Sequence, residues 1–178
     1  IAQRWENRGI FTQSGWRSKV AAGKTDISSM FVYEAVSGYL KQDGMMTFLL
    51  PINLFKNPSG GEGFRRFNTK NDKKFSPILV EDLNSCQAFR NRTTSTCIAV
   101  FKNGSSPDYP VPYYLWAENS NESRKDDPSS FDVIKQVGQP AHGESTSSLI
   151  NGSPEFVSAC KKFTGSNQYT ARSGVNTG

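Results

Sequence analysis

The pattern that most constrains the fold is a helix, a tight turn and an apolar strand between residues 26 and 50. Over residues 26–40 apolar side chains recur at helical spacing, and Asp26 is placed to cap the first turn. A Gln42-Asp43-Gly44 turn follows, and residues 45–50 then form an almost continuous apolar run. Such a run is typical of a strand buried on both faces of a parallel sheet, so the pattern predicts half of a βαβ unit. The helical apolar positions are Ile27, Met30, Phe31, Ala35, Val36, Tyr39 and Leu40.

Three more strands are predicted further along the chain. Apolar and β-branched residues at 78–80 and 96–101 indicate two of them. Because only about a dozen residues without a helical pattern separate these two, we expect an antiparallel return. Residues 109–116 form the third, which we place at an edge because Pro110 and Pro112 cannot sit in a central strand. Before them, a loop over residues 57–61 opens a short basic helix through residues 64–67.

Polar residues, Gly and Pro dominate two stretches of the last third of the chain, residues 119–130 and 143–153. These stretches predict loops or a linker, so we expect the sheet to end near Trp116. A last helix is indicated by Ser153 as its cap and Pro154 as its first residue. The expected class is α/β, with one domain over residues 1–116 and a connecting region over residues 117–178.

Composition excludes several classes of protein. No window approaches the 18 consecutive apolar residues that a membrane span needs. The chain opens on Ile1 with no signal-peptide pattern, so we expect it to be a segment of a longer protein. The three cysteines show no CxxC spacing, which favours a reducing, cytoplasmic compartment. Because His142 is the only histidine, we expect no metal site and no Ser-His-Asp triad.

Positive charge is concentrated in the first part of the chain. The whole chain has 21 Lys and Arg against 16 Asp and Glu, and residues 1–103 hold 15 of the basic and 8 of the acidic side chains. Aromatic residues are interleaved with this charge, as in many nucleic-acid-binding surfaces. The alternative is a solvated face beside ordinary core aromatics. The candidate DNA-binding residues are Arg17, Lys19, Arg65, Arg66, Lys73, Lys74, Arg90 and Arg92.

Three segments, taken in order, resemble the second half of an adenine-N6 DNA methyltransferase. They are the Asp26-Ile-Ser-Ser-Met-Phe31 start of the helix, residues 40–55 with the core Met-Met-Thr-Phe-Leu-Leu-Pro-Ile-Asn-Leu-Phe, and residues 88–101. The resemblance covers about residues 20–116, and residues 169–178 are similar to the lead-in to the recognition domain of such enzymes. It implies a doubly wound, Rossmann-like sheet with an antiparallel strand pair at its end. It also implies S-adenosylmethionine as cofactor and a restriction–modification or phage-defence enzyme as the parent.

The chain departs from the family pattern at its two central motifs. It contains neither the Gly-rich loop that binds S-adenosylmethionine nor the Asn/Asp-Pro-Pro-aromatic tetrapeptide that holds the target amine. We expect both before Ile1, so no catalytic residue is assigned within this chain. The chain then carries half of an active site, and we expect it to be inactive alone.

Three residues take roles from the resemblance. Phe89 stands where the family packs a ring on the extruded adenine, and a loop anchor in the core is the competing interpretation. Phe31 stands where the family places an apolar side chain against the cofactor adenine, and Asp26 borders the same pocket. For these two, an ordinary core position and a plain helix cap are the competing interpretations.

The sequence thus predicts part of a cytoplasmic enzyme that methylates the N6 amine of adenine in double-stranded DNA, with no membrane partner. The rest of the parent polypeptide is its other expected partner. The alternative is a noncatalytic nucleic-acid-binding or interaction module that keeps the methyltransferase-like half-sheet. An Asn-Pro-Pro-aromatic tetrapeptide upstream of Ile1 in the full-length gene would favour the enzyme, and its absence would favour the module.

Overall fold

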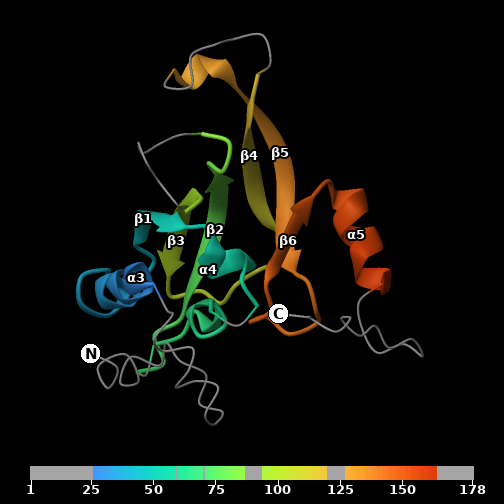
Figure 1. The fold of residues 1–178 in the computed structure, drawn as a ribbon. Helices are drawn as coiled ribbons and strands as arrows, with labels where there is room; N and C mark the ends of the chain where they lie inside the picture. The colour runs from blue at the N-terminus through green and yellow to red at the C-terminus, as the bar shows by residue number, and fades with distance from the viewer. Residues whose placement is uncertain (1–25, 59, 70, 87–93, 120–126, 164–178) are drawn as a thin grey trace, which may run out of the picture.

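The computed structural model describes residues 26–58, 60–69, 71–86, 94–119 and 127–163, and these form an α/β structure (Figure 1). Helices and sheet strands alternate at first, and the strands then follow one another. In chain order the elements are α3 (Ile27–Gly38), β1 (Met45–Pro51), α4 (Asn53–Lys56), the 3-10 helix η1 (Phe64–Arg66), β2 (Phe75–Asp82), β3 (Thr96–Asn103), β4 (Val111–Glu118), the 3-10 helix η2 (Pro128–Ser130), β5 (Phe131–Pro140), β6 (Leu149–Gly152) and α5 (Pro154–Phe163).

One mixed sheet contains all six described strands, in the order β1-β3-β2-β4-β5-β6. Its only parallel pair is β2 with β4, matched over Val80–Asp82 and Tyr113–Leu115. The antiparallel return from β2 to β3 is confirmed, as are the short helix near residue 65 and the last helix. The strand β3 lies between β1 and β2 and runs opposite to both. Therefore β1 and β2 run in the same direction.

Helix α3 begins where the sequence predicts, and Val36 is buried as expected, but the rest of the buried face differs from the predicted one. The backbone N–H of Ser28 donates to Oδ1 of Asp26 at 2.9 Å, which satisfies one of the open N–H groups of the first turn. The buried residues are Ser29, Val32, Tyr33 and Val36. Ile27 and Phe31, expected on the core face, are 55% and 56% exposed.

The strand β1 is an edge strand, not the doubly buried central strand that its apolar run predicts. It pairs with β3 alone, and it pairs antiparallel. Its side chains alternate, since Leu50 lies in the core while Met45 and Leu49 are 66% and 44% exposed. No βαβ unit therefore forms around β1 within the described residues.

The strand β4 is central, not at an edge as its prolines predict. It pairs with β5 over its whole length and with β2 only from Tyr113 to Leu115. Pro112 lies outside the stretch that has neighbours on both sides. A proline lacks the N–H that a second neighbour would require, and here only β5 lies opposite it.

The sheet continues past Trp116 into a region expected to be a linker. The strand β5 pairs antiparallel with β4, and β6 pairs with β5 from residue 149 onward. Figure 1 shows the β4–β5 ribbon extending well beyond the rest of the sheet. Leu149 of β6 is 4% exposed and belongs to the same core as β1 to β3.

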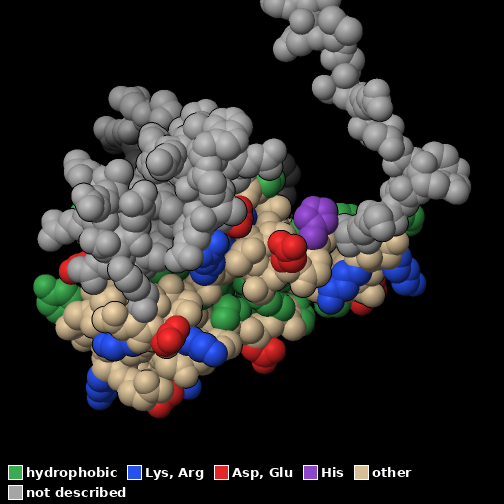
Figure 2. Space-filling model, turned by 90° about the horizontal axis from the view of Figure 1, so that it is seen from below, with side chains coloured by type: hydrophobic (Ala, Val, Ile, Leu, Met, Phe, Trp, Pro, Cys, Tyr) green, Lys and Arg blue, Asp and Glu red, His purple; other side chains and the backbone are tan. Residues whose placement is uncertain are grey.

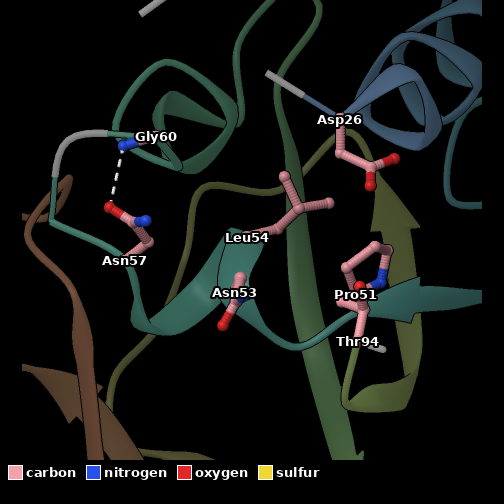
Figure 3. Close-up of a pocket in the computed structure, with 7 residues that line it drawn as sticks. All are labelled: Asp26, Pro51, Asn53, Leu54, Asn57, Gly60 and Thr94. Atoms are coloured by element: carbon pink, nitrogen blue, oxygen red, sulfur yellow. Dashed lines mark hydrogen bonds between the residues drawn. The ribbon is translucent and has the colours of Figure 1, made fainter. Parts of the chain in front are cut away.

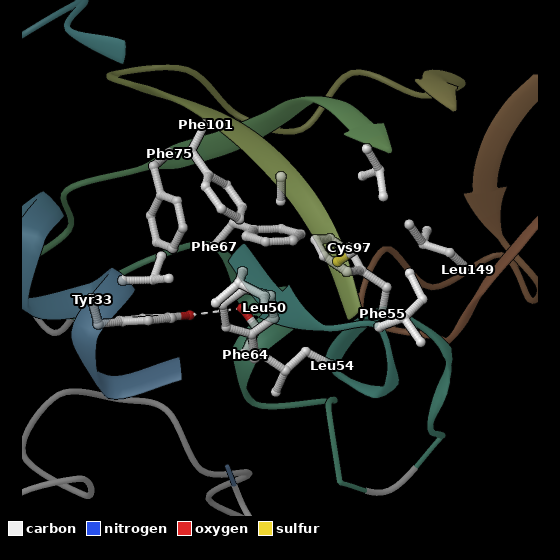
Figure 4. Close-up of a cluster of buried hydrophobic side chains, with 14 of the residues drawn as sticks. Tyr33, Leu50, Leu54, Phe55, Phe64, Phe67, Phe75, Cys97, Phe101 and Leu149 are labelled. Atoms are coloured by element: carbon white, nitrogen blue, oxygen red, sulfur yellow. Dashed lines mark hydrogen bonds between the residues drawn. The ribbon is translucent and has the colours of Figure 1, made fainter. Parts of the chain in front are cut away.

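That core is rich in aromatic side chains and lies between the sheet and the three elements α3, α4 and η1 (Figure 4). The rings of Tyr33 and Phe75 meet edge to face with centroids 5.0 Å apart, and Phe55 and Phe64 do so at 5.6 Å. Edge-to-face pairs add roughly 0.5 to 1.5 kcal/mol each beyond the area they bury. The Tyr33 hydroxyl donates to the carbonyls of Gly63 and Phe64, which ties α3 to η1.

Candidate functional site

A pocket of about 180 Å³ lies where β1 ends and α4 begins (Figure 3). Asp26 contributes from the start of α3, Asn53 from α4, and Thr94 from the segment just before β3. The walls are therefore the ends of helices and strands and the loop after α4, where polar groups are not all paired within a helix or a sheet. The complete lining is Asp26, Pro51, Asn53, Leu54, Asn57, Gly60 and Thr94.

The lining is polar but contains no Lys, Arg, His or Cys. Its functional groups are the carboxylate of Asp26, the amides of Asn53 and Asn57, and the hydroxyl of Thr94. Amides offer both donors and acceptors, and a hydroxyl can act as either. The pocket therefore suits recognition of a small ligand through complementary hydrogen bonds.

The loop after α4 is held in shape by its own hydrogen bonds. The backbone N–H of Gly60 donates to Oδ1 of Asn57 at 3.0 Å, as Figure 3 shows. Gly61 follows directly, and a Cβ there would run into the Leu54 carbonyl and the guanidinium of Arg65. A glycine is thus required at position 61 for the chain to pass this close to Arg65.

Arg65 is a structural residue, which corrects its assignment as a phosphate ligand. Its side chain is fully buried. Its Nη1 donates to the carbonyls of Leu54 and Asn57 at 2.8 and 2.9 Å, and its Nη2 donates to that of Pro58 at 3.2 Å. Burial lowers the pKa of Arg65 to about 10. These bonds fix the carbonyls of α4 and of the loop beside the pocket, and they leave Arg65 turned away from solvent.

A second buried polar group braces α4 from the other side. Nζ of Lys56 lies 2.8 Å from Oδ2 of Asp82 on β2, and the Tyr113 hydroxyl on β4 donates to the same oxygen. Asp82 is 1% exposed, and its Oδ1 accepts the N–H of Asn84 at 3.0 Å. Burial, followed by the hydrogen bond to Asp82, raises the pKa of Tyr113. This network joins α4, β2 and β4, and no sequence motif marks it.

The predicted site residues lie in different places. Asp26 lines the pocket, whereas the largely exposed Phe31 does not. Arg66 is half-buried on η1. Lys73 and Lys74 are exposed beside the start of β2, at the opposite end of β1 from the pocket. The remaining predicted residues, Arg17, Lys19, Phe89, Arg90 and Arg92, lie outside the described residues.

The described residues contain neither a membrane-crossing helix nor a cluster of metal ligands. No helix there has the length and apolar character that a membrane crossing requires. No three side chains among His, Cys, Asp and Glu of those residues gather as metal ligands would.

The pocket was only partly foreseen from the sequence. Asp26 was identified, but Asn53, Asn57 and Thr94 were not, because Asn and Thr in loops are too common to stand out. A comparison of the chain with models of known protein families gives no match, and a comparison with curated proteins gives none either.

Proposed function

We propose that this chain is part of an S-adenosylmethionine-dependent DNA methyltransferase that acts on the N6 amine of adenine, and that the pocket at the end of β1 receives the target base. The parent is a site-specific enzyme of a restriction–modification or phage-defence system. In this proposal the residues that bind the cofactor and hold the reacting amine belong to parts of the parent outside this sequence.

One observation carries the proposal. The three segments on which the family resemblance rests are far apart in the chain, yet each contributes to the same pocket. Asp26 comes from the first segment, Pro51 and Asn53 come from the second, and Thr94 comes from the third. A pocket to which all three segments contribute supports the proposal, because it gives the residues of the resemblance one shared location.

The strand order gives further support. The proposed sheet ends in an antiparallel strand pair, and here β3 turns back between β1 and β2 and runs opposite to both. The outer edge of β1 has no partner strand among the described residues. An open, partly apolar edge is where the first half of a doubly wound sheet would continue.

The pocket fits a single base better than the cofactor. Pockets that enclose a drug-sized ligand measure about 300 to 1,000 Å³, and this one measures about 180 Å³. Phe31, which the resemblance placed against the cofactor adenine, is exposed and lies outside the pocket lining. We therefore assign this pocket to the base and not to the cofactor.

For an adenine, the pocket residues supply recognition and not chemistry. Base-modifying enzymes take the target out of the stack and read its hydrogen-bonding edge. The Asn53 amide and the Thr94 hydroxyl are suited to that edge, since an amide carries both donors and acceptors and a hydroxyl can act as either. Phe89, five positions before Thr94, keeps its proposed role as the ring that stacks on the base.

Base extrusion can be tested with the chain itself. A duplex with 2-aminopurine in a mismatch is easily opened, so a pocket that accepts the base should change its fluorescence on binding. Thr94→Val and Asn53→Leu should weaken the change at saturating protein by about 5-fold or more, with melting temperatures unchanged. Thr47→Val is the matched control, because Thr47 is an exposed threonine on β1 and is not part of the pocket lining.

Two results would contradict the proposal. Binding without any fluorescence change would favour the noncatalytic nucleic-acid-binding module. A fluorescence change that Thr94→Val, Asn53→Leu and Thr47→Val all leave intact would place the base somewhere other than this pocket.

A further inference from the structure

A second hollow lies at the opposite end of β1 from the candidate base pocket. It measures about 450 Å³, and its lining includes Lys41, Lys73 and Lys74. Lys41 comes from the turn after α3, and the other two come from the turn that enters β2. All three are exposed, and Asp72 is the only acidic side chain in the lining.

The lysines are presented by a cross-braced frame of turns. The side chain of Asn103, which is 4% exposed, donates from Nδ2 to the carbonyls of Leu40 and Lys41 at 3.0 and 2.9 Å. The backbone N–H of Gly104 donates to the Lys74 carbonyl at 2.7 Å, with Gly104 at a φ of +86°. These bonds hold Lys41 and Lys74 on opposite sides of one hollow.

The excess positive charge of this hollow is only partly neutralised by its surroundings. The nearby Lys102 is paired with Asp43 at 3.4 Å, so these two charges offset one another. Asp72 accepts a hydrogen bond from Asn68 at 3.3 Å, and Nζ of Lys73 donates to the Ser37 carbonyl at 2.8 Å. Three lysines against one aspartate leave a net positive hollow. Figure 2, which views the molecule from below, shows basic side chains in separate groups on that face.

The hollow is too far from the candidate pocket to belong to it. The seven residues of β1 separate the two, and at a rise of about 3.3 Å per residue that is a distance of about 20 Å. That distance corresponds to roughly six base pairs along a DNA duplex, at 3.4 Å per step. A ligand held at both ends must therefore be extended and repeatedly anionic at this end.

We infer that the hollow formed by Lys41, Lys73 and Lys74 is a separate binding site for the phosphodiester backbone of double-stranded DNA. The choice of DNA over another polyanion rests on the proposed function, while the site itself rests on the three lysines and their frame. Lysine binds phosphate as a point charge without reading bases, so this contact holds DNA of any sequence.

The experiment compares two charge-matched triple variants of the whole chain. Lys41→Gln, Lys73→Gln and Lys74→Gln together remove three charges from the hollow, and Lys135→Gln, Lys161→Gln and Lys162→Gln remove three from β5 and α5. Affinity for a labelled 20-base-pair duplex is measured by fluorescence anisotropy at several salt concentrations. Each lost phosphate contact lowers the slope of log affinity against log salt by about 0.9. We expect a slope smaller by about 2 to 3 for the hollow variant, little change for the control, and near-normal binding for Lys→Arg at the three hollow positions.

Two outcomes would overturn the inference. Equal losses in both triple variants would show that net charge acts without a defined site. The hollow would instead be a site for small anions if pyrophosphate shifted the NMR signals of its residues while the hollow variant bound DNA with unchanged affinity. The 2-aminopurine response depends on Asn53 and Thr94 and not on the lysines. If the unmutated chain gives no such response while the lysine effect is present, the methyltransferase proposal is refuted and this DNA site still stands.

Discussion

The guanidinium of Arg65 donates from Nε to the carbonyl oxygen of Thr146 at 2.8 Å, across 81 positions of the chain. Its two other nitrogens bind carbonyls of α4 and the following loop, so one side chain connects the candidate pocket to the turn between β5 and β6. The part of the chain expected to be a linker is thus bonded directly to the part that carries the family resemblance.

Replacement of Arg65 should strongly destabilise the fold. Arg65→Lys keeps the charge but cannot reach four carbonyls in one plane, so buried acceptors lose their donors and stability should fall by about 3 kcal/mol. Arg66→Lys is the control, since Arg66 is half-buried, and it should cost less than about 1 kcal/mol. Urea unfolding midpoints measure both. Equal costs at the two positions would contradict the structural role of Arg65.

Two glycines should respond to alanine in opposite directions. Gly61→Ala would push a methyl group into the Leu54 carbonyl and the Arg65 guanidinium, so we expect a loss of at least about 2 kcal/mol. Gly38→Ala at the end of α3 meets no atom within 4 Å and should stabilise the protein by up to about 1 kcal/mol. Thermal unfolding of the two variants in parallel is the measurement. A neutral Gly61→Ala would show that the loop beside the pocket gives way easily.

Asp26 has two roles that substitutions can separate. Asp26→Ser retains a helix cap and removes the carboxylate, whereas Asp26→Ala removes both. We expect Asp26→Ala to lose about 0.5 to 2 kcal/mol and Asp26→Ser to lose a few tenths. If the carboxylate also contacts the base, both variants should alter the 2-aminopurine response. A normal response in Asp26→Ser would leave the cap as its only function.

Stability should decline at alkaline pH because buried tyrosines resist ionisation. Burial raises the pKa of Tyr109 to about 12, and its hydroxyl is buried without a hydrogen-bond partner. Between about pH 10 and pH 12 the folded state therefore holds a proton that the unfolded state releases, and stability falls as pH rises. The lowered pKa of Arg65 acts in the opposite direction over the same range.

The comparison that isolates Tyr109 is therefore Tyr109→Phe against the wild type. This variant should be at least as stable at pH 8, since it removes an unpaired buried hydroxyl, and its stability should fall less steeply above pH 10. Tyr39→Phe is the matched control, because Tyr39 is 86% exposed. If the stability of the wild type and of Tyr109→Phe fell equally steeply above pH 10, the buried Tyr109 hydroxyl would not be the cause of the decline. Urea unfolding at pH 8, 9.5 and 10.5 measures the slopes.

Local sequence signals correctly predict where α3 begins, but they do not predict which of its faces is buried. Asp26 marked the start of α3 correctly because a cap is decided by neighbouring residues. The buried face contains Ser29 and Tyr33, which apolar periodicity would not select. Ser29 Oγ donates to the Asp26 carbonyl at 2.8 Å and Tyr33 donates to the η1 carbonyls. Polar residues that satisfy their own hydrogen bonds can occupy a core face without any visible pattern.

Strand pairing could not be predicted from composition alone. The apolar run of β1 predicted a central strand, but the position of a strand in a sheet depends on partners distant in sequence. The strand β5 has four exposed residues in succession, 132–135, and it forms because β4 lies beside it and not because of its own pattern. The role of Arg65 beside the pocket could not be predicted either. Arg65 binds backbone carbonyls, which every residue carries, so no sequence pattern marks its partners.

The pocket at the end of β1 also has an evolutionary consequence. All its walls come from the ends of elements and the loop after α4, while the hydrogen-bonded ladder of the sheet contributes only Pro51 at its margin. Insertions and substitutions accumulate in such connecting segments more readily than in the elements they join. Lineages that descend from a common ancestor of this chain could therefore diverge in what the pocket accepts while the aromatic core and the strand order stay the same.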